Sequence, residues 1–269
     1  MCPLAGADML SYQHSYHAGN AADVHKHAAL ALALDWMTRK DKALTYIESH
    51  AGRGLYDLSG AAARKTGEAA QGVRRLAGRL PADHPYATAL AAIRAGHGAE
   101  AYPGSPLIAA HLLRRFDRIE LAELHPAEHA ALLAAMPDSP NTRIHHRDGL
   151  EMAKALTPPD PRRGLLLIDP SWEMRDDYTR LAALLPALHR KWGVGVLMLW
   201  YPLLGDDRHA PMTRALRDAI PDIMLHEVRF PPARDTHGMR GSGLAIVNAP
   251  HGFALRAREL AAIFEEETE

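Results

Sequence analysis

The clearest strand signal in the chain is the continuous apolar run at residues 165–168. A strand that is buried on both faces of a parallel sheet has no polar alternation, so an uninterrupted run of this length is typical of it. The sequence Asp-Pro-Ser-Trp at 169–172 ends the run, and Pro170, which cannot donate to a sheet ladder, favours an extended conformation at Asp169. The pattern predicts a carboxylate and the indole of Trp172 together at the carboxyl edge of a sheet, where open α/β sheets bind ligands.

Six other segments are apolar or alternate with period two, and helical spacing fills most of the chain between them. The other expected strands are residues 43–49, 118–124, 142–147, 194–200, 223–230 and 243–248. The expected helices are residues 20–39, 107–115, 127–136, 178–192 and 212–219, and one that ends near residue 156. Either Asn20 or Asp23 is a suitable cap for the first helix. Because only a loop separates the last two strands, the order predicts a doubly wound α/β sheet of five parallel strands, completed by an antiparallel edge pair.

The chain is expected to form one domain, over residues 9–269, after a flexible extension at residues 1–8. The segment from about 57 to 101 shifts to Ala, Arg, Gly and Glu in helical spacing, which predicts a helical insertion after the first strand. This segment is the most basic part of the chain, and Arg74 and Arg75 lie within it. Its arginines are candidates for contacts with phosphate, although a charged helix face is more often simply solvated.

Composition restricts the classes of protein to which this chain can belong. With 269 residues, 47% of them hydrophobic, the chain can bury a sizeable core, and 31 basic against 32 acidic residues leave no global basic field for a nucleic acid. Cys2 is the only cysteine, which excludes an internal disulfide and a cysteine metal cluster. No metal is expected at the 17 histidines, because no characteristic ligand spacing frames them. The longest apolar run, 194–204, is too short to cross a membrane and no signal peptide opens the chain, so a cytoplasmic protein is expected.

Polar groups follow three other strands, at the edge that Asp169 shares. The first strand runs into His50-Ala-Gly-Arg-Gly54, whose glycines let backbone amides approach a ligand, although Gly52 and Gly54 alone are weak evidence. Glu123 ends the second strand, where a carboxylate can accept two hydrogen bonds from a ribose diol. Asp148-Gly149 ends the third, and supplies a polar group for an adenine. These three sites suit a cofactor that holds adenosine and an amino acid, namely S-adenosylmethionine.

The remaining strand end, Asp169 to Trp172, is then available for the chemical step. An acid, a proline carbonyl and an aromatic ring suit methyl transfer to an exocyclic amine, whose lone pair is delocalised into the base. Hydrogen bonds from the amine to Asp169 and to the carbonyl of Pro170 would draw the nitrogen toward tetrahedral geometry. Trp172 would stack on the flipped base. No strong base is needed, since the methylated amine is acidic once formed.

Six motifs in the chain resemble the RlmJ family, which methylates the N6 position of an adenine in 23S ribosomal RNA. The similarity runs from residue 9 to about residue 250. The motifs are Met9-Leu-Ser-Tyr-Gln-His-Ser-Tyr-His-Ala-Gly-Asn20, Ala22-Asp-Val-His-Lys-His27, Ser49-His-Ala-Gly-Arg-Gly54, Tyr102-Pro-Gly-Ser-Pro-Leu-Ile-Ala109, Glu123-Leu-His-Pro126 and Leu199-Trp-Tyr-Pro202.

The resemblance implies a Rossmann-like class I methyltransferase fold with a helical insertion after the first strand. It implies S-adenosylmethionine as the methyl donor and, as the substrate, 23S ribosomal RNA that is still largely free of ribosomal protein. The residues that it places around the cofactor are Lys26, His27, His50, Ser105, Glu123, Asp148 and Gly149. It also implies that Tyr12 and His14 lie in an amino-terminal arm that helps to close the site over the substrate.

Ser171 departs from the family's usual motif, Asp-Pro-Pro-aromatic, because it stands in place of the second proline. The carboxylate, the first proline carbonyl and an aromatic are retained, so we expect activity to survive in a less rigid loop. The alternatives are a family member with impaired chemistry, an adenine methyltransferase for DNA or another RNA, and a non-catalytic RNA-binding protein of the same fold. A nicotinamide-dependent dehydrogenase is disfavoured, because Asp57 stands where a third glycine would be needed and the sheet ends in an antiparallel pair.

Overall fold

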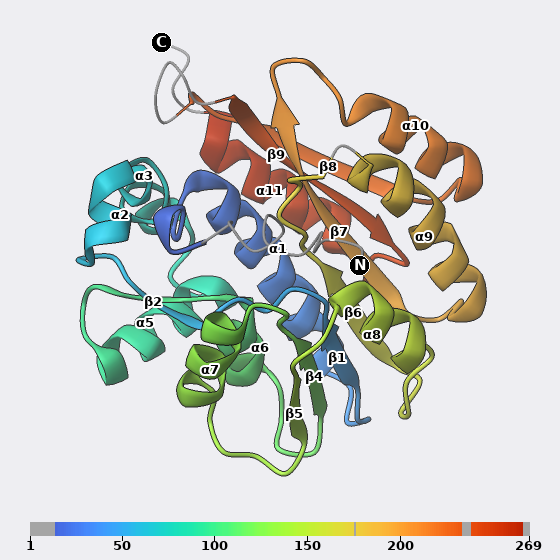
Figure 1. Cartoon of the computed structure of the whole chain (residues 1–269), viewed down its shortest axis with the longest axis horizontal. Helices are drawn as coiled ribbons and strands as arrows, with labels where there is room; N and C mark the ends of the chain where they lie inside the picture. Colours follow the sequence, from blue (N-terminus) through green and yellow to red (C-terminus); the bar gives the residue numbers. More distant parts are fainter. Residues whose placement is uncertain (1–13, 175, 233–237, 266–269) are drawn as a thin grey trace, which may run out of the picture.

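A seven-stranded sheet forms the centre of the protein, as the computed structural model shows for residues 14–174, 176–232 and 238–265 (Figure 1). The strands are β1 (Thr45–Glu48), β4 (Arg118–Ala122), β5 (Thr142–His145), β6 (Gly164–Ile168), β7 (Val196–Leu204), β8 (Met224–Arg229) and β9 (Met239–Val247). Their order is β5-β4-β1-β6-β7-β9-β8. The first five in this order run parallel, and β9 is antiparallel to both β7 and β8. The predicted fold class, a Rossmann-like class I methyltransferase sheet with an antiparallel edge pair, is confirmed.

The register aligns the carboxyl ends of the central strands. Glu48 at the end of β1 pairs with Leu121 of β4 on one side and with Leu167 of β6 on the other. The loops that follow these three strands therefore begin at the same level of the sheet. This alignment brings the glycine turn, Glu123 and Asp169 to one edge.

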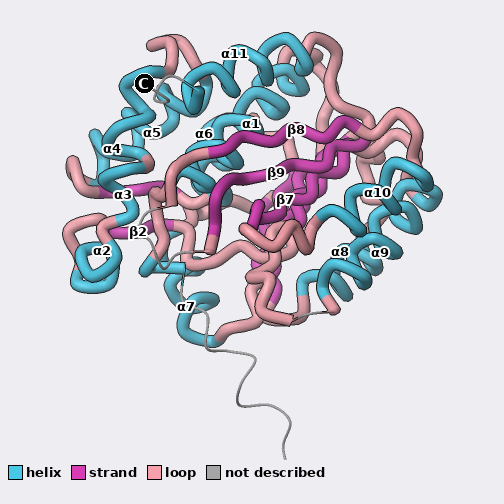
Figure 2. Tube along the Cα trace, turned by 90° about the horizontal axis from the view of Figure 1, so that it is seen from above, coloured by secondary structure: helices cyan, strands magenta, loops and turns pink. Residues whose placement is uncertain are grey.

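Two helix layers cover the sheet, which Figure 2 shows between them. One layer contains α1 (Ala21–Thr38), α5 (Pro85–His97), α6 (Ser105–Leu112) and α11 (Phe253–Glu265). The other contains α8 (Gly149–Leu156), α9 (Asp177–Lys191) and α10 (Ala210–Ala219). Leu165 and Leu167 of β6 pack into the first layer, whereas Leu166 and Ile168 pack into the second. Burial on both faces is the reason that the sequence of β6 is apolar without alternation.

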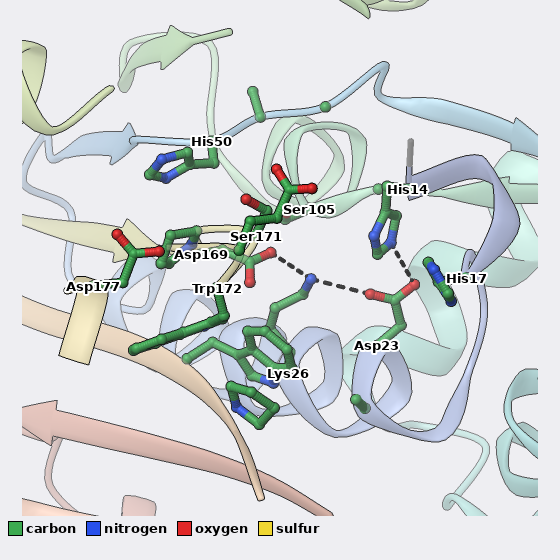
Figure 3. A pocket seen from close by; sticks show the side chains of 18 of the residues that line it. His14, His17, Asp23, Lys26, His50, Ser105, Asp169, Ser171, Trp172 and Asp177 are labelled. Carbon is green, nitrogen blue, oxygen red and sulfur yellow. Dashed lines mark hydrogen bonds and ion pairs between the residues drawn. The ribbon is translucent and has the colours of Figure 1, made fainter. Parts of the chain in front are cut away.

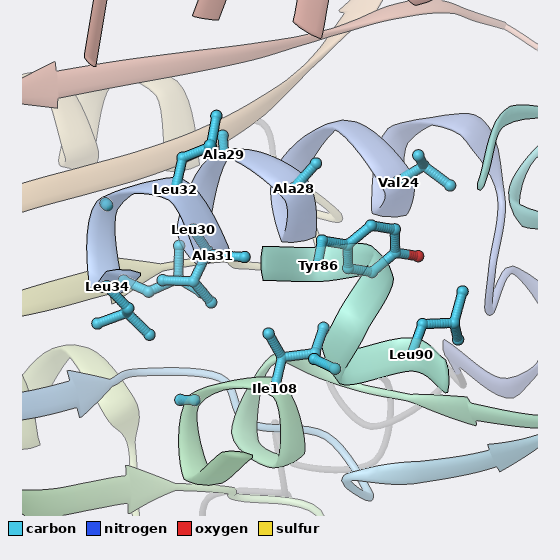
Figure 4. Packing of buried hydrophobic residues seen from close by; sticks show 14 of the residues in the cluster. Val24, Ala28, Ala29, Leu30, Ala31, Leu32, Leu34, Tyr86, Leu90 and Ile108 are labelled. Atoms are coloured by element: carbon cyan, nitrogen blue, oxygen red, sulfur yellow. The ribbon is translucent and has the colours of Figure 1, made fainter. Parts of the chain in front are cut away.

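Helix α1 is buried along almost its whole length. Asn20 caps it by accepting a hydrogen bond from the Asp23 amide, at 2.8 Å. Its alanines allow close approach on several sides, and Figure 4 shows Ala28 and Leu30 among side chains of α5 and α6, including Tyr86 and Ile108. Burial of this kind holds the first turns of α1 rigidly beside the carboxyl edge of the sheet.

The segment between β1 and β4 contains a small antiparallel sheet that the sequence did not predict, made of β2 (Leu55–Asp57) and β3 (Ala101–Pro103). Short helices connect these two strands before α5, namely α2 (Ala61–Thr66), α3 (Glu68–Gln71), α4 (Val73–Leu76) and the 3-10 helix η2 (Ala77–Arg79). The backbone of Gly72 lies so close to the Gly19 carbonyl that an added Cβ would overlap it. This approach ties the short helices to the start of α1. The proposed limits of a separate insertion, 57–101, stay a prediction.

Two strands and one helix differ from the expectations. The expected end of the fifth strand at Trp200 was wrong, because β7 continues through Pro202 to Leu204. Pro202 is tolerated there because the pairing of β7 with β6 ends at Leu199, so that beyond this residue β7 is paired on one side only, with the antiparallel β9. Strand β9 itself begins four residues before the expected Gly243, and a register irregularity follows at Leu203/Leu204. The terminal helix α11 was not anticipated. No helix among the described residues is long and apolar enough to cross a membrane.

Glu48, the last residue of β1, carries a carboxyl group that is fully buried. Burial raises its pKa to about 8, although the hydroxyls of Tyr46 and Ser105 donate hydrogen bonds to its two oxygens and oppose the shift. The folded protein therefore keeps a neutral acid at the centre of the sheet edge at pH 7.

Removal of core volume from β6 should destabilise the whole sheet. Leu167→Ala deletes a fully buried side chain and leaves a cavity between β6 and α1, so we expect the free energy of unfolding to fall by roughly 2–5 kcal/mol. Leu255→Ala is the matched control, because Leu255 on α11 is 63% exposed and its loss should change stability by about 0.5 kcal/mol or less. Urea denaturation of both variants checks the difference, and equal effects would contradict the packing described for β6.

The buried acid should also appear in the pH dependence of stability. Between the ordinary pKa of 4.5 and the folded value of about 8, the folded state binds more protons than the unfolded state, so Glu48 contributes a loss of stability as pH rises. Glu48→Gln removes this loss. Relative to the wild type, the variant should gain stability from pH 5 to pH 8, by at most about 1.4 kcal/mol per pH unit. Glu151→Gln, at a side chain 55% exposed, is the control and should show no such gain in denaturation curves.

Candidate active site

A cavity of about 870 Å³ opens at the carboxyl ends of β1, β4, β6 and β7. Eleven of the residues predicted for the site line it: His14, Lys26, His27, His50, Gly52, Ser105, Glu123, Asp148, Asp169, Pro170 and Trp172. Gly149, Arg74 and Arg75 do not line the cavity, and Tyr12 lies outside the described residues. Figure 3 shows side chains from the amino-terminal segment, from α1 and from the loops after β1 and β6 facing one another across this space.

Glu123 and the glycine turn after β1 form one wall of the cavity. Gly52 has a φ of +62°, in the region that favours glycine, and its amide donates to Glu123 Oε2 at 2.8 Å. The amide of His125 donates to Glu123 Oε1 at the same distance. Burial raises the pKa of Glu123, although the hydrogen bonds from the two backbone amides lower it. Since each carboxylate oxygen can accept a second hydrogen bond, the group can still receive two hydroxyls from a ligand.

Asp148 and Gly149 are adjacent in sequence but serve different purposes. Asp148 lines the cavity and caps α8 by accepting from the Glu151 amide at 2.8 Å. Gly149 lies against the loop after β1, where an added Cβ would overlap the Ser49 carbonyl. Gly149 therefore permits the close approach of α8 to this loop, and any contribution to ligand binding is indirect.

The ammonium of Lys26 connects two carboxylates at the base of the cavity. Its Nζ donates to Asp169 Oδ2 at 2.6 Å and to Asp23 Oδ1 at 3.0 Å, as the dashed lines in Figure 3 show. Burial by itself would lower the pKa of Lys26, but the two carboxylates outweigh it and hold the pKa above its ordinary value. The cation thus stays charged and fixes one oxygen of Asp169.

Asp23 connects Lys26 to the amino-terminal segment. His14, in the 3-10 helix η1 (His14–Tyr16), contacts Asp23 Oδ2 through Nε2 at 2.9 Å, and the amide of Gly19 donates to the same oxygen at 2.9 Å. Burial favours the neutral acid, yet His14 and Lys26 lower the pKa of Asp23 well below its ordinary value. The order His14, Asp23, Lys26, Asp169 therefore links the arm to the end of β6 through direct contacts between successive side chains.

The loop after β6 presents its aromatic residue through an unusual backbone. Trp172 has a φ of +58°, in the left-handed region that a bulky residue rarely adopts. Its indole packs on Tyr178 of α9, with ring centroids 4.5 Å apart. Pro170 is buried, whereas Ser171 is exposed at the cavity. The packing on Tyr178 offsets part of the strain and fixes the indole next to Asp169.

Three further polar side chains of the site are held by neighbours. His27 Nδ1 lies 2.9 Å from the Tyr102 hydroxyl, and burial lowers the pKa of His27 to about 3. His50 Nδ1 lies 2.7 Å from Ser49 Oγ, and burial also lowers the pKa of His50. Ser105 donates its hydroxyl to Glu48. The two histidines are therefore neutral groups in this cavity at pH 7.

The two arginines expected to touch substrate lie on α4, outside the cavity. Arg74 forms an ion pair with Glu100, and Arg75 Nη1 donates to Gln71 Oε1 at 2.9 Å. Neither contact ties these arginines to the residues around Asp169. In the described part of the chain, no three His, Cys, Asp or Glu side chains are placed to hold a metal ion.

Sequence reasoning missed three residues that the structure places in or beside this site. Asp23 was considered only as a helix cap, although its spacing of three from Lys26 on one helix face was a usable signal. Trp200 lay in a quoted motif without a role, yet it lines the cavity. Tyr178, which supports Trp172, was given no role, although its partner lies only a few residues before it in the sequence.

The comparisons with known proteins agree with this geometry. The family model described as "Ribosomal RNA large subunit methyltransferase D, RlmJ" matches residues 41–267. Ribosomal RNA large subunit methyltransferase J of Escherichia coli (strain K12) is 37% identical over 246 residues, which cover 90% of this chain and 88% of that protein. The protein of the same name from Haemophilus influenzae is 36% identical over 257 residues, covering 94% and 92%.

A crystal structure of a Legionella pneumophila protein superposes with a TM-score of 0.82 at 33% identity, and covers 92% of this chain and 94% of that one. The residues that the family model matches include all those lining the cavity except the ones that precede β1. On the strength of the family match and of relatives that align along nearly their full length, the chain belongs to the RlmJ family of large-subunit ribosomal RNA methyltransferases.

Proposed function

We propose that the protein transfers a methyl group from S-adenosylmethionine to the N6 amine of an adenine in 23S ribosomal RNA. One observation carries the chemical part of this proposal. The Asp169 carboxylate and Pro170 end a buried strand inside the cavity, directly beside a glycine turn and an acid suited to an adenosine cofactor. Membership of the methyltransferase family supports the donor and the class of substrate.

The residues present fit the cofactor. Glu123 retains acceptor capacity for the two ribose hydroxyls, while the turn at Gly52 and the tight approach at Gly149 leave backbone close to the space that the cofactor would fill. Asp148 offers a carboxylate at the neighbouring strand end for the adenine. When bound there, S-adenosylmethionine supplies an electrophilic methyl group on a sulfonium.

Asp169 would receive the substrate amine with the oxygen that Lys26 leaves available. Lys26 occupies Oδ2, so Oδ1 and the carbonyl of Pro170 can each accept one hydrogen bond from the amine. Two such acceptors orient the nitrogen lone pair toward the methyl group and favour a tetrahedral nitrogen. After transfer the nitrogen carries a surplus proton, which it loses readily without a strong base. Trp172 offers an aromatic face to the flipped base.

The arm and the neutral histidines would complete the environment of the reaction. His14 contacts Asp23, which is paired with Lys26, so closure of the arm over the substrate would affect the position of Lys26. We place Tyr12 in the same arm. His27 and His50 would line the cofactor as neutral side chains, together with Ser105.

RNA would bind through local basic patches, because the chain has a net charge of −1. Arg74 and Arg75 lie on the basic segment between β2 and β3. The side chain of Arg74 is exposed, and Arg75 is hydrogen-bonded to the exposed Gln71. We propose that the substrate is RNA largely free of ribosomal protein, modified in the cytoplasm before the large subunit is fully assembled.

Substitution of the acceptor carboxylate should separate chemistry from cofactor binding. Asp169→Asn keeps a carbonyl near Lys26 but weakens the acceptor for the amine, so the single-turnover rate of methyl transfer should fall roughly a hundredfold or more. Binding of S-adenosylmethionine, measured by calorimetry, should persist. The control is Asp218→Asn, at an exposed position of α10, which should retain the wild-type rate.

The same assay distinguishes the alternatives. Labelled methyl transfer is measured side by side on protein-free 23S ribosomal RNA and on duplex DNA. Preferred methylation of DNA would replace the proposed substrate, and full activity of Asp169→Asn would overturn the mechanism. RNA binding by wild-type protein without detectable cofactor binding would identify a non-catalytic member of the fold.

The contribution of the two arginines to RNA binding has an electrostatic signature. Replacement of Arg74 and Arg75 by alanine should weaken RNA binding and reduce the slope of log affinity against log salt by roughly 1.4, the value for two lost contacts with single-stranded phosphate. Arg256 and Arg258 on α11 provide the matched double-alanine control, since Arg256 is likewise paired with an exposed carboxylate, Glu259. An unchanged slope would assign Arg74 and Arg75 to a solvated helix face.

A further inference from the structure

Trp200 lies on the wall of the cavity but has no part in the mechanism described so far. It belongs to β7, is half-buried, and lines the cavity together with Pro202 and Leu204. The ammonium of Lys26 lies over its ring, 5.7 Å from the centroid. A cation at this distance from an indole face is attracted by the ring electrons. The ring is therefore a third partner of the lysine that holds Asp169.

A buried chain of hydrogen bonds leads away from the edge of this indole. Trp200 Nε1 donates to Ser242 Oγ at 2.8 Å. Ser242 Oγ lies 2.8 Å from His25 Nδ1, and His25 Nε2 lies 2.8 Å from His226 Nδ1. His226 Nε2 in turn lies 2.8 Å from the carbonyl of Ala257 in α11. The chain thus crosses from β7 through β9 and α1 to β8 and α11.

The direction of every bond in this chain is determined by its two ends. A carbonyl can only accept, so His226 Nε2 carries a proton and donates it to Ala257. Neutral His226 then accepts at Nδ1 from His25 Nε2, and neutral His25 accepts at Nδ1 from the Ser242 hydroxyl. The indole N–H of Trp200, which can only donate, satisfies the oxygen of Ser242. All four donors and acceptors are matched in one arrangement.

Both histidines have the neutral form that this arrangement needs. Burial, followed by the proximity of His226, lowers the pKa of His25 well below its ordinary value. Burial also lowers the pKa of His226. A second proton on His226, at Nδ1, would face the N–H of His25 and break the bond between the two rings. The chain of hydrogen bonds therefore holds the indole of Trp200 in one position at neutral pH.

We infer that Trp200 is a positioning residue for methyl transfer, whose indole face, fixed by Ser242, His25 and His226, holds the ammonium of Lys26 against Asp169. Lys26 has a long side chain with two carboxylates within reach, and the indole restricts it to the geometry that spans both. His25 precedes Lys26 on α1, so the helix that carries the lysine is also the helix that carries the support. The inference rests on the proposed methyl transfer.

Substitutions of the indole test this role directly. Trp200→Leu removes the aromatic face and should lower the single-turnover rate, at saturating RNA and cofactor, about tenfold, while S-adenosylmethionine affinity changes less than about twofold. Trp200→Phe keeps an aromatic face and should recover most of the rate. Trp36→Leu is the matched control, because Trp36 also lies under a cation, with Arg39 5.0 Å from its ring, but on the exposed side of α1.

A pair of substitutions at His226, at the far end of the chain of hydrogen bonds, tests whether this chain supports Trp200. His226 does not line the cavity, and glutamine offers one acceptor and one donor as neutral histidine does, so His226→Gln should keep the rate. His226→Leu leaves His25 Nε2 without an acceptor and should lower the rate at saturation, not the binding of cofactor. Equal rates for these two variants, or an unaltered rate in Trp200→Leu, would overturn the inference.

Crystal structures give a readout that does not depend on the reaction. In Trp200→Leu the distance from Lys26 Nζ to Asp169 Oδ2 should increase from 2.6 Å, whereas Trp36→Leu should preserve it. An unchanged distance would also overturn the inference. Absence of methyl transfer in the wild type would refute the proposed function instead, and the measured distance would still decide whether Trp200 positions Lys26.

Discussion

The site depends on the buried ammonium of Lys26, because it lies between two carboxylates and attracts both, which offsets their mutual repulsion away from water. Asp23 and Lys26 come from α1 and Asp169 from the end of β6, so the ion pairs join the first helix to the central strand. Buried ion pairs add little net stability, since the cost of removing charges from water offsets much of their attraction. Removal of one member is nevertheless costly, at about 3–5 kcal/mol, because a charge is then left uncompensated. The arrangement is better understood as a means of fixing atoms than as a source of stability.

Much of the architecture was predictable because it is written in local patterns. The uninterrupted apolar run of β6 indicated burial on both faces, and the polar residues after β1, β4 and β6 indicated a shared edge. Parallel strands necessarily present the same end to that edge, so Gly52, Glu123 and Asp169 could be assembled on paper. The Pro202 region could not, because the continuation of β7 is decided by pairing with β9, some forty residues later, and proline in a strand ordinarily predicts an end.

The supports of the site were hidden for a related reason. His25 and Ser242 are 217 positions apart, and nothing local to either residue indicates the other. The segment before α1 belongs to one of the six motifs, but it also contacts Glu68, in the short helices between β2 and β3. Residues that touch a ligand carry chemical signals in their types and spacing. Residues that hold them in place are recognisable only once the chain is folded.

The burial of α1 has a consequence for the order in which the protein can be made. In this chain α1 precedes every strand of the sheet and leaves the ribosome before them, yet it packs against β9 and α11, which are synthesised after the other strands. A growing chain must therefore carry a helix with an uncovered apolar surface and an unpaired His25 until its carboxyl-terminal part appears. Contacts of such long sequence separation slow folding. They also mean that Lys26 acquires its final surroundings only in a completed chain, so that an interrupted translation product would lack an assembled site.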